Sequence, residues 1–171
     1  ETDKSRIGMP FSLAVHDMNL STIIGKTNKD STGQTIDSGM QARMNRLRIW
    51  DSRTMFRDSS SRNFTTAFIL LDKLKDKLSL TAPIVEKTAY TYRKVQEAGL
   101  VRGRTIGAVL VACLYITCRE LGVSRTIDEL AQASNIRRKA IAKIYRDIVF
   151  HKKQKIPQVN CFQCIDKIAN K

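Results

Sequence analysis

Two clusters of cations are the residues of this chain best able to do chemistry. The first flanks a glycine, with Arg102 and Arg104 on either side of Gly103. The second follows a turn at residues 134–136 and comprises four cations: Arg137, Arg138, Lys139 and Lys143. Cationic side chains beside a glycine, or at a helix start where backbone N–H groups are free, suit phosphate oxygens. These seven residues are therefore candidate contacts to a nucleic-acid backbone.

The distribution of charge favours an anionic partner. The chain has 171 residues, with 30 Lys and Arg against 16 Asp and Glu, and a formal net charge of +14. Residues 101–158 carry 12 basic and 4 acidic side chains, so more than half of the excess lies in one third of the chain. This balance favours nucleic acid first, and an acidic protein or a membrane surface second. Basic loops that only keep the domain soluble are the alternative.

Duplex DNA fits these clusters better than a single strand. Proteins that bind single strands place exposed aromatic rings among their cations, on which bases stack. The basic loops here hold no aromatic residue. Residues 127–133 and 137–151 also have the pattern of a helix-turn-helix, with a short capped helix, a three-residue turn and a longer helix.

Signatures of catalysis and of metal binding are missing from the sequence. There is no glycine-rich phosphate loop, no Gly-x-Ser-x-Gly and no His-Glu-x-x-His. His16 stands beside Asp17 without a nucleophile to activate. Cys161 and Cys164 form one C-x-x-C pair, whereas zinc needs a second pair or two histidines. We therefore expect no enzymatic activity, and we interpret the C-x-x-C as part of an ordinary helix.

One apolar stretch is predicted to position both basic clusters. Every residue from Ala108 to Ile116 is apolar, which is too short for a membrane span of about 20 residues. The stretch predicts a helix at 105–121 that is buried on nearly all sides. Thr105 can cap its start, and Gly122 provides a left-handed stop. The helix also holds two cysteines, interpreted as buried, reduced packing residues: Cys113 and Cys118.

Apolar residues at spacings of three and four predict four more helices, at 62–78, 82–98, 127–133 and 137–151. Thr126 and Glu129 have the spacing of a capping box before the third of these. Five helices joined by short loops predict an all-α, five-helix bundle over residues 59–156.

The first 57 residues are predicted to form an extension of the bundle. Residues 1–38 are expected to be an extended, flexible segment, in which the alternation of Phe11, Leu13 and Val15 indicates a strand or a stretch lying in a partner's cleft. Residues 39–58 change to a basic helix with one stripe of four arginines and a tryptophan: Arg43, Arg46, Trp50, Arg53 and Arg57. This stripe is either a solvated linker helix or a segment that contacts phosphate or an acidic groove.

Several runs of the sequence resemble archaeal transcription factor B, the counterpart of eukaryotic general transcription factor IIB. Three lie in the predicted bundle and resemble the first cyclin-like repeat: GLVRGR at 99–104, ACLYITCRELGV at 112–123 and IRRKAI at 136–141. Two more precede the bundle. Gly8-x-Pro10-x-Ser12-Leu13-Ala14-x-His16-Asp17-x-x-Leu20-Ser21-Thr22 resembles the B-reader, and Arg46-Leu47-Arg48-x-Trp50 resembles the B-linker.

The resemblance implies a cyclin-like fold and a role in transcription initiation, bridging TATA-binding protein on promoter DNA to RNA polymerase. It supports five of the candidate DNA contacts: Gly103, Arg104, Arg138, Lys139 and Lys143. Arg102 and Arg137 rest on their chemistry alone. The reader and linker are expected to aid start-site selection and DNA opening, with contacts to polymerase or template from eight residues: Ser12, His16, Asp17, Arg43, Arg46, Arg48, Trp50 and Arg53.

The expected organisation is a reader-like extension (1–38), a linker-like basic segment (39–58), a first cyclin-like repeat (59–156), and a connector with the start of a truncated second repeat (157–171). Zinc is expected only in the family's N-terminal ribbon, which these residues lack. The resemblance implies a cytoplasmic, nucleoid-associated protein of an archaeal cell, with no membrane partner. Two alternatives stay open: a cyclin-type regulator that binds only protein, and a stand-alone helix-turn-helix repressor.

Overall fold

The computed structural model describes residues 10–22, 24–30, 32–55, 58–152 and 156–157, together with Ile165 and Ala169. Six α-helices follow one another in these residues: α1 (Ser38–Met55), α2 (Ser59–Leu78), α3 (Ala82–Glu97), α4 (Ile106–Glu120), α5 (Ile127–Ser134) and α6 (Arg138–Lys152). The only β-type pairing within the described ranges is a single bridge between Lys29 and Thr35. The prediction of an all-α fold is confirmed.

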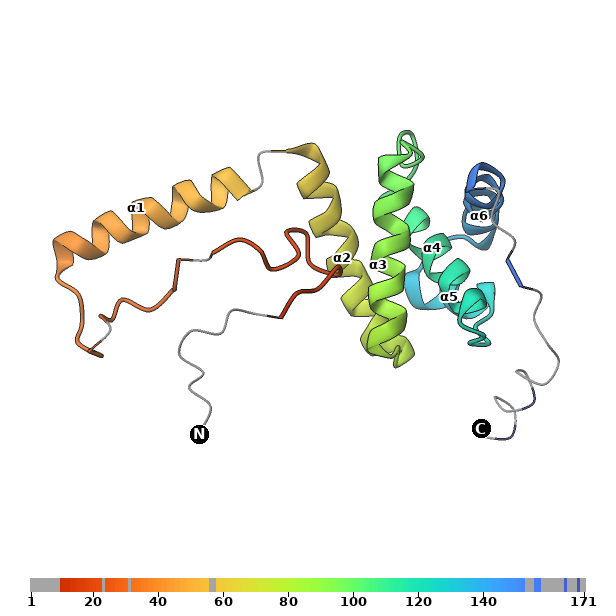
Figure 1. The fold of residues 1–171 in the computed structure, drawn as a ribbon, viewed down its shortest axis with the longest axis horizontal. Helices are drawn as coiled ribbons and strands as arrows, with labels where there is room; N and C mark the ends of the chain where they lie inside the picture. Colours follow the sequence, from red (N-terminus) through yellow and green to blue (C-terminus); the bar gives the residue numbers. More distant parts are fainter. Residues whose placement is uncertain are drawn as a thin grey trace.

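The helix α4 is the centre of the molecule. It contacts α2, α3, α5 and α6, which surround it (Figure 1). Ten of its fifteen residues are buried, running from Ala108 to Cys118 with Tyr115 the one partly exposed position between them. The prediction of a buried central helix is therefore correct, and the five helices α2 to α6 correspond to the predicted bundle.

The surrounding helices bury the stripes that their spacing predicts. In α2 the buried residues are Ala67, Phe68, Leu71 and Leu74, and in α6 they are Ile141, Ile144 and Ile148. Full burial of one such aliphatic side chain contributes about 1.5–3 kcal/mol relative to leaving it in water. Repeated at intervals of three and four residues, this term fixes which face of each helix turns toward α4.

Local turn chemistry sets the helix ends. Thr126 and Glu129 form the predicted capping box, with each side chain bonding to the backbone of the other residue. Gly99 and Gly122 follow α3 and α4 at φ values of 73° and 71°, a region that favours glycine. Thr105 sits at the predicted N-cap position with extended backbone, but its hydroxyl makes no capping hydrogen bond.

The N-terminal part differs from the predicted free extension. Residues 10–22 form turns against α2 and α3, with Leu13 and Ala14 packed on the core, and α1 projects away from the bundle (Figure 1). The predicted strand around Leu13 is wrong, because the chain turns back where Met18 and Asn19 take positive φ values. The predicted helix after Pro157 lies outside the described residues, apart from Ile165 and Ala169.

Candidate nucleic-acid and partner interface

The loop between α3 and α4 presents the first basic cluster. Arg102 and Gly103 are exposed, and Gly103 has a φ of 73°, so the turn itself requires glycine there. Arg104 is only partly exposed and bonds within the molecule instead. Its guanidinium donates to the carbonyl of Leu100 and forms an ion pair with Asp147 of α6, with Nη2 2.9 Å from Oδ2. Arg104 therefore ties this loop to α6.

The turn between α5 and α6 presents the second cluster. Asn135 takes a left-handed conformation (φ 56°) and sends the chain from α5 into α6. The four predicted cations around the start of α6 are all exposed: Arg137, Arg138, Lys139 and Lys143. Arg138 makes an ion pair with Asp128, with Nε 3.3 Å from Oδ1, but both side chains are more than half exposed, so water and salt screen this pair.

A further cation connects the two clusters. Arg146 is exposed and lies three residues after Lys143 and seven after Lys139, so the three share one stripe of α6. At 1.5 Å per residue the stripe is about 10 Å long, and it ends beside the Arg104–Asp147 pair. The spacing alone could have identified Arg146. We call the stripe and the exposed residues of both clusters the basic face: Arg102, Gly103, Arg137, Arg138, Lys139, Lys143 and Arg146.

The cations at the other end of α4 have structural roles. Arg119 donates to the hydroxyl of Tyr145 (3.3 Å) and to the carbonyl of Pro157 (3.0 Å). Arg125 donates to the carbonyl of Leu78 at the end of α2 (2.7 Å). These contacts occupy both guanidinium groups within the bundle, so Arg119 and Arg125 are not part of the basic face.

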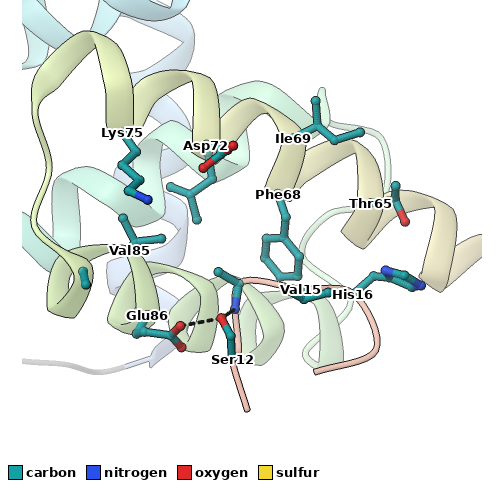
Figure 2. Close-up of a pocket in the computed structure, with 13 residues that line it drawn as sticks. Ser12, Val15, His16, Thr65, Phe68, Ile69, Asp72, Lys75, Val85 and Glu86 are labelled. Carbon is teal, nitrogen blue, oxygen red and sulfur yellow. Dashed lines mark hydrogen bonds between the residues drawn. The ribbon is translucent and has the colours of Figure 1, made fainter. Parts of the chain in front are cut away.

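The reader-like residues lie on the bundle. Ser12 donates to Glu86 of α3, with Oγ 2.5 Å from Oε1, and lines a groove between the segment and α2 together with His16 (Figure 2). Partial burial raises the pKa of Asp17, but hydrogen bonds from the Ser21 hydroxyl and from backbone amides outweigh it and hold this pKa below its ordinary value. The structure thus brings these side chains to α2 and α3.

The linker-like helix α1 exposes most of its predicted residues. Arg43, Arg46, Trp50 and Arg53 are exposed, with the guanidinium of Arg53 5.2 Å from the centre of the Trp50 ring. Arg57 lies outside the described residues. This helix therefore presents cations and an apolar ring together.

Arg48 is the exception on α1. Its guanidinium donates to the carbonyl of Gly25 (2.7 and 3.0 Å), the carbonyl of Thr27 (3.2 Å) and the side chain of Asn28 (2.8 Å). Arg48 therefore fastens the loop before α1 to the helix, which leaves less of it for a partner.

Metal ligands do not gather anywhere in the described ranges, where no group of three or more His, Cys, Asp or Glu could hold an ion. Cys113 and Cys118 are buried, free thiols. Cys161 and Cys164 lie outside the described residues. None of the helices that the structure describes is long and apolar enough to cross a membrane.

Comparison with known sequences gives one consistent match. The profile of the transcription factor TFIIB repeat matches residues 60–151, which cover α3 to α5 and nearly all of α2 and α6. A transcription initiation factor IIB of Methanococcus maripaludis (strain C5) is 43% identical over 145 residues, which are 85% of this chain and 43% of the relative. Those of Methanothrix thermoacetophila and Archaeoglobus fulgidus are each 41% identical, over 84% and 85% of this chain and 42% and 44% of the relatives. The chain spans less than half the length of these curated relatives.

Proposed function

Because the chain belongs to the transcription factor TFIIB repeat family, we propose that it acts in transcription initiation, bridging a TATA-binding protein on promoter DNA to RNA polymerase. The relatives that it matches are named transcription initiation factor IIB. The observation that carries the proposal is the basic face: Lys139, Lys143 and Arg146 are exposed along one stripe of α6, and the Arg104–Asp147 ion pair ties the loop of the first cluster to the same helix.

The basic face would bind the DNA backbone beside the TATA element. Lys139, Lys143 and Arg146 follow one another along α6, and the free N–H groups at the start of that helix add favourable partial charges for a phosphate. These contacts read no base edge, so the face positions the protein on DNA and the TATA-binding protein supplies the sequence preference. Arg104 contributes by holding the Gly103 turn against α6.

The N-terminal part would contact polymerase. The exposed cations and Trp50 of α1 suit an acidic groove with apolar walls, and Ser12, His16 and Asp17 would act near the template strand. Support comes from the B-reader and B-linker motifs in the sequence. The proposed activity is assembly without catalysis.

A binding titration separates this proposal from its two rivals. Labelled TATA-box DNA is titrated with the chain at several salt concentrations, with and without an archaeal TATA-binding protein. We expect weak binding alone and a stable ternary complex, with a log–log salt slope of about −4 to −5 for roughly 4–6 phosphate contacts. A repressor would bind tightly without the TATA-binding protein, and a protein-only regulator would show no dependence on DNA.

Two triple variants test the residues. Arg102→Ala, Lys139→Ala and Lys143→Ala together remove three exposed cations of the basic face. The control, Lys73→Ala, Lys75→Ala and Lys94→Ala, removes the same charge from α2 and α3, across the bundle from α6 (Figure 1). The first should weaken the ternary complex at least about tenfold and make the salt slope less negative by about 3, since each phosphate contact contributes about 0.9. An equal loss of ternary-complex affinity in both triple variants would refute the assignment of DNA contacts to the basic face.

A further inference from the structure

We infer that the α2–α3 face is a resting site for residues 12–16, and that this segment must leave the face before its side chains contact RNA polymerase. The first half rests on the contacts in this chain alone. The second half rests on the proposed function.

Glu86 holds the start of the segment with both carboxylate oxygens. Oε1 accepts the hydroxyl hydrogen bond of Ser12 at 2.5 Å (Figure 2). Oε2 accepts the backbone N–H of Leu13 at 2.8 Å. Both bonds involve an ionised acceptor and are therefore stronger than neutral ones. This contact joins positions more than 70 residues apart, so it fixes where the segment lies on the bundle.

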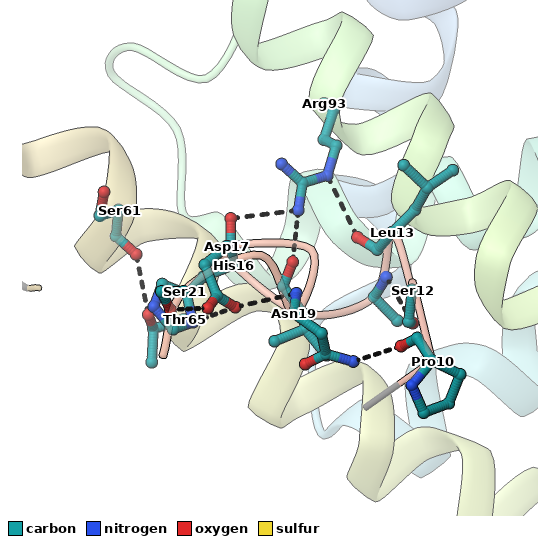
Figure 3. Close-up of polar contacts among 12 residues, drawn as sticks. Pro10, Ser12, Leu13, His16, Asp17, Asn19, Ser21, Ser61, Thr65 and Arg93 are labelled. Carbon is teal, nitrogen blue, oxygen red and sulfur yellow. Dashed lines mark hydrogen bonds and ion pairs between the residues drawn. The ribbon is translucent and has the colours of Figure 1, made fainter. Parts of the chain in front are cut away.

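Arg93 holds the rest of the segment. Its guanidinium donates to the carbonyls of Leu13 (3.1 Å), Val15 and His16 (3.2 Å), as Figure 3 shows in part. The same group lies 4.7 and 5.1 Å from the ring centres of Phe64 and Phe68 of α2. The planar fork of an arginine suits such combined stacking and hydrogen bonding. Glu86 and Arg93 are seven residues apart, two turns along one side of α3.

The segment is folded to fit this site. Asn19 closes it on itself by donating to the carbonyl of Pro10 (2.7 Å), and the Met18 amide bonds to the carbonyl of Val15 (3.1 Å). Met18 and Asn19 have φ values of 58° and 60°, a left-handed conformation that asparagine tolerates and that is costly for methionine. Because four of the five bonds from Glu86 and Arg93 go to backbone atoms, the two residues recognise this folded shape.

Docking occupies the groups proposed to meet polymerase. The Ser12 hydroxyl is bound to Glu86, the side chains of His16 and Asp17 are only 20% and 18% exposed, and Asp17 accepts from Ser21. A partner that needs the free segment binds with an affinity reduced by the undocked fraction. If about nine molecules in ten are docked, the apparent affinity falls about tenfold.

Hydrogen–deuterium exchange of the whole chain tests the docking without polymerase. We expect the backbone amides of residues 10–20 to exchange several-fold faster in Arg93→Ala, Glu86→Ala and Leu13→Pro than in the unmodified chain. The last change removes the amide that Glu86 binds and leaves α3 intact. Lys94→Ala, a neighbour on α3, is the control. Unchanged exchange of residues 10–20 in all three variants, with α4 still protected, would overturn the docking.

Titration with an archaeal RNA polymerase tests the competition. Arg93→Ala and Glu86→Ala should bind polymerase about threefold or more tightly than the unmodified chain, and Lys94→Ala should bind like it. Equal or weaker binding, in variants whose segment exchanges faster, would overturn the competition and leave the docking in place. Failure of every chain to bind polymerase would instead refute the proposed function, while exchange still decides the docking.

Discussion

Two buried thiols make the stability of the bundle sensitive to alkaline pH. Burial raises the pKa of Cys113 to about 12 and that of Cys118 to about 11, from an ordinary value of 9.0. Above pH 9 the unfolded chain ionises these thiols and the folded chain does not. The stabilising effect is therefore complete below pH 9 and declines as pH rises toward the folded values.

We expect each thiol to lower the free energy of unfolding by about 1.4 kcal/mol between pH 8 and 10. Urea titrations at both pH values should show that the Cys113→Ala, Cys118→Ala double variant loses less stability over this interval than the unmodified chain, by roughly 2–3 kcal/mol. The baseline cost of the two alanines cancels, because only the change with pH is compared. An identical change in both chains would contradict the burial of these groups in their neutral form.

The hydroxyl of Tyr92 is a second residue-level test. It is buried and has no hydrogen-bond partner among the residues that the structure describes, and burial raises the pKa of Tyr92. Tyr92→Phe should therefore leave the free energy of unfolding unchanged or raise it by up to about 1 kcal/mol, measured by urea titration. Tyr145→Phe is the control, because its hydroxyl accepts from Arg119 and its removal should destabilise. A clear loss for Tyr92→Phe would mean that its hydroxyl is bonded.

At the scale of the helices, the end of α4 depends on one glycine. Gly122 has a φ of 71°, and the next residue bonds back from its amide to the carbonyl of Cys118 at 2.8 Å. Gly122→Ala should cost about 1 kcal/mol of unfolding free energy, because a Cβ atom is crowded in this conformation. Gly39→Ala is the comparison, since it lies in the first turn of α1 with ordinary space around it. Thermal unfolding of both variants measures the difference. A higher stability of Gly122→Ala than of Gly39→Ala would contradict the assignment.

The basic stripe on α6 gives a second prediction at this scale. Arg146→Ala should weaken the ternary complex with TATA-binding protein and DNA about three- to tenfold and make the salt slope less negative by about 1. Among the residues that the structure describes, its side chain donates to the Ala142 carbonyl of its own helix alone, at 3.3 Å, so the fold should be unaffected. Lys73→Ala serves as control in the same anisotropy titration. Matching affinities and slopes for the two variants would exclude Arg146 from the basic face.

The helices were largely predictable because their signals are local. Apolar spacing predicted α2 to α6 to within a few residues, and Gly122 and the Thr126–Glu129 pair predicted where two of them end or begin. The Arg104–Asp147 and Ser12–Glu86 pairs were not predictable, since they join residues 43 and 74 positions apart and leave no periodic trace in the sequence. Sequence reasoning therefore took Arg104 and Ser12 for partner contacts, whereas each also holds the molecule together.

At the scale of the whole molecule, the basic face and the docked segment lie on different sides of the bundle. The basic face lies along α6, and the docked segment lies across α2 and α3 on the other side of α4 (Figure 1). A ternary complex on DNA would therefore leave Glu86 and Arg93 accessible. We expect the proposed exchange between docked and free states of residues 12–16 to proceed on the DNA-bound protein as well.

The Arg48 anchor has a consequence for how strongly the docked segment competes. Residues 10–22 sit on the bundle, and Arg48 fastens the following loop to α1. Because α1 leads back along the chain to α2, the docked segment is tethered to the face that it contacts. A ligand tethered in this way acts at an effective concentration on the order of millimolar. A single backbone cleavage in the loop at residues 24–36 would make the same contact bimolecular. At micromolar protein the segment would then dissociate, although every residue of the α2–α3 face was intact.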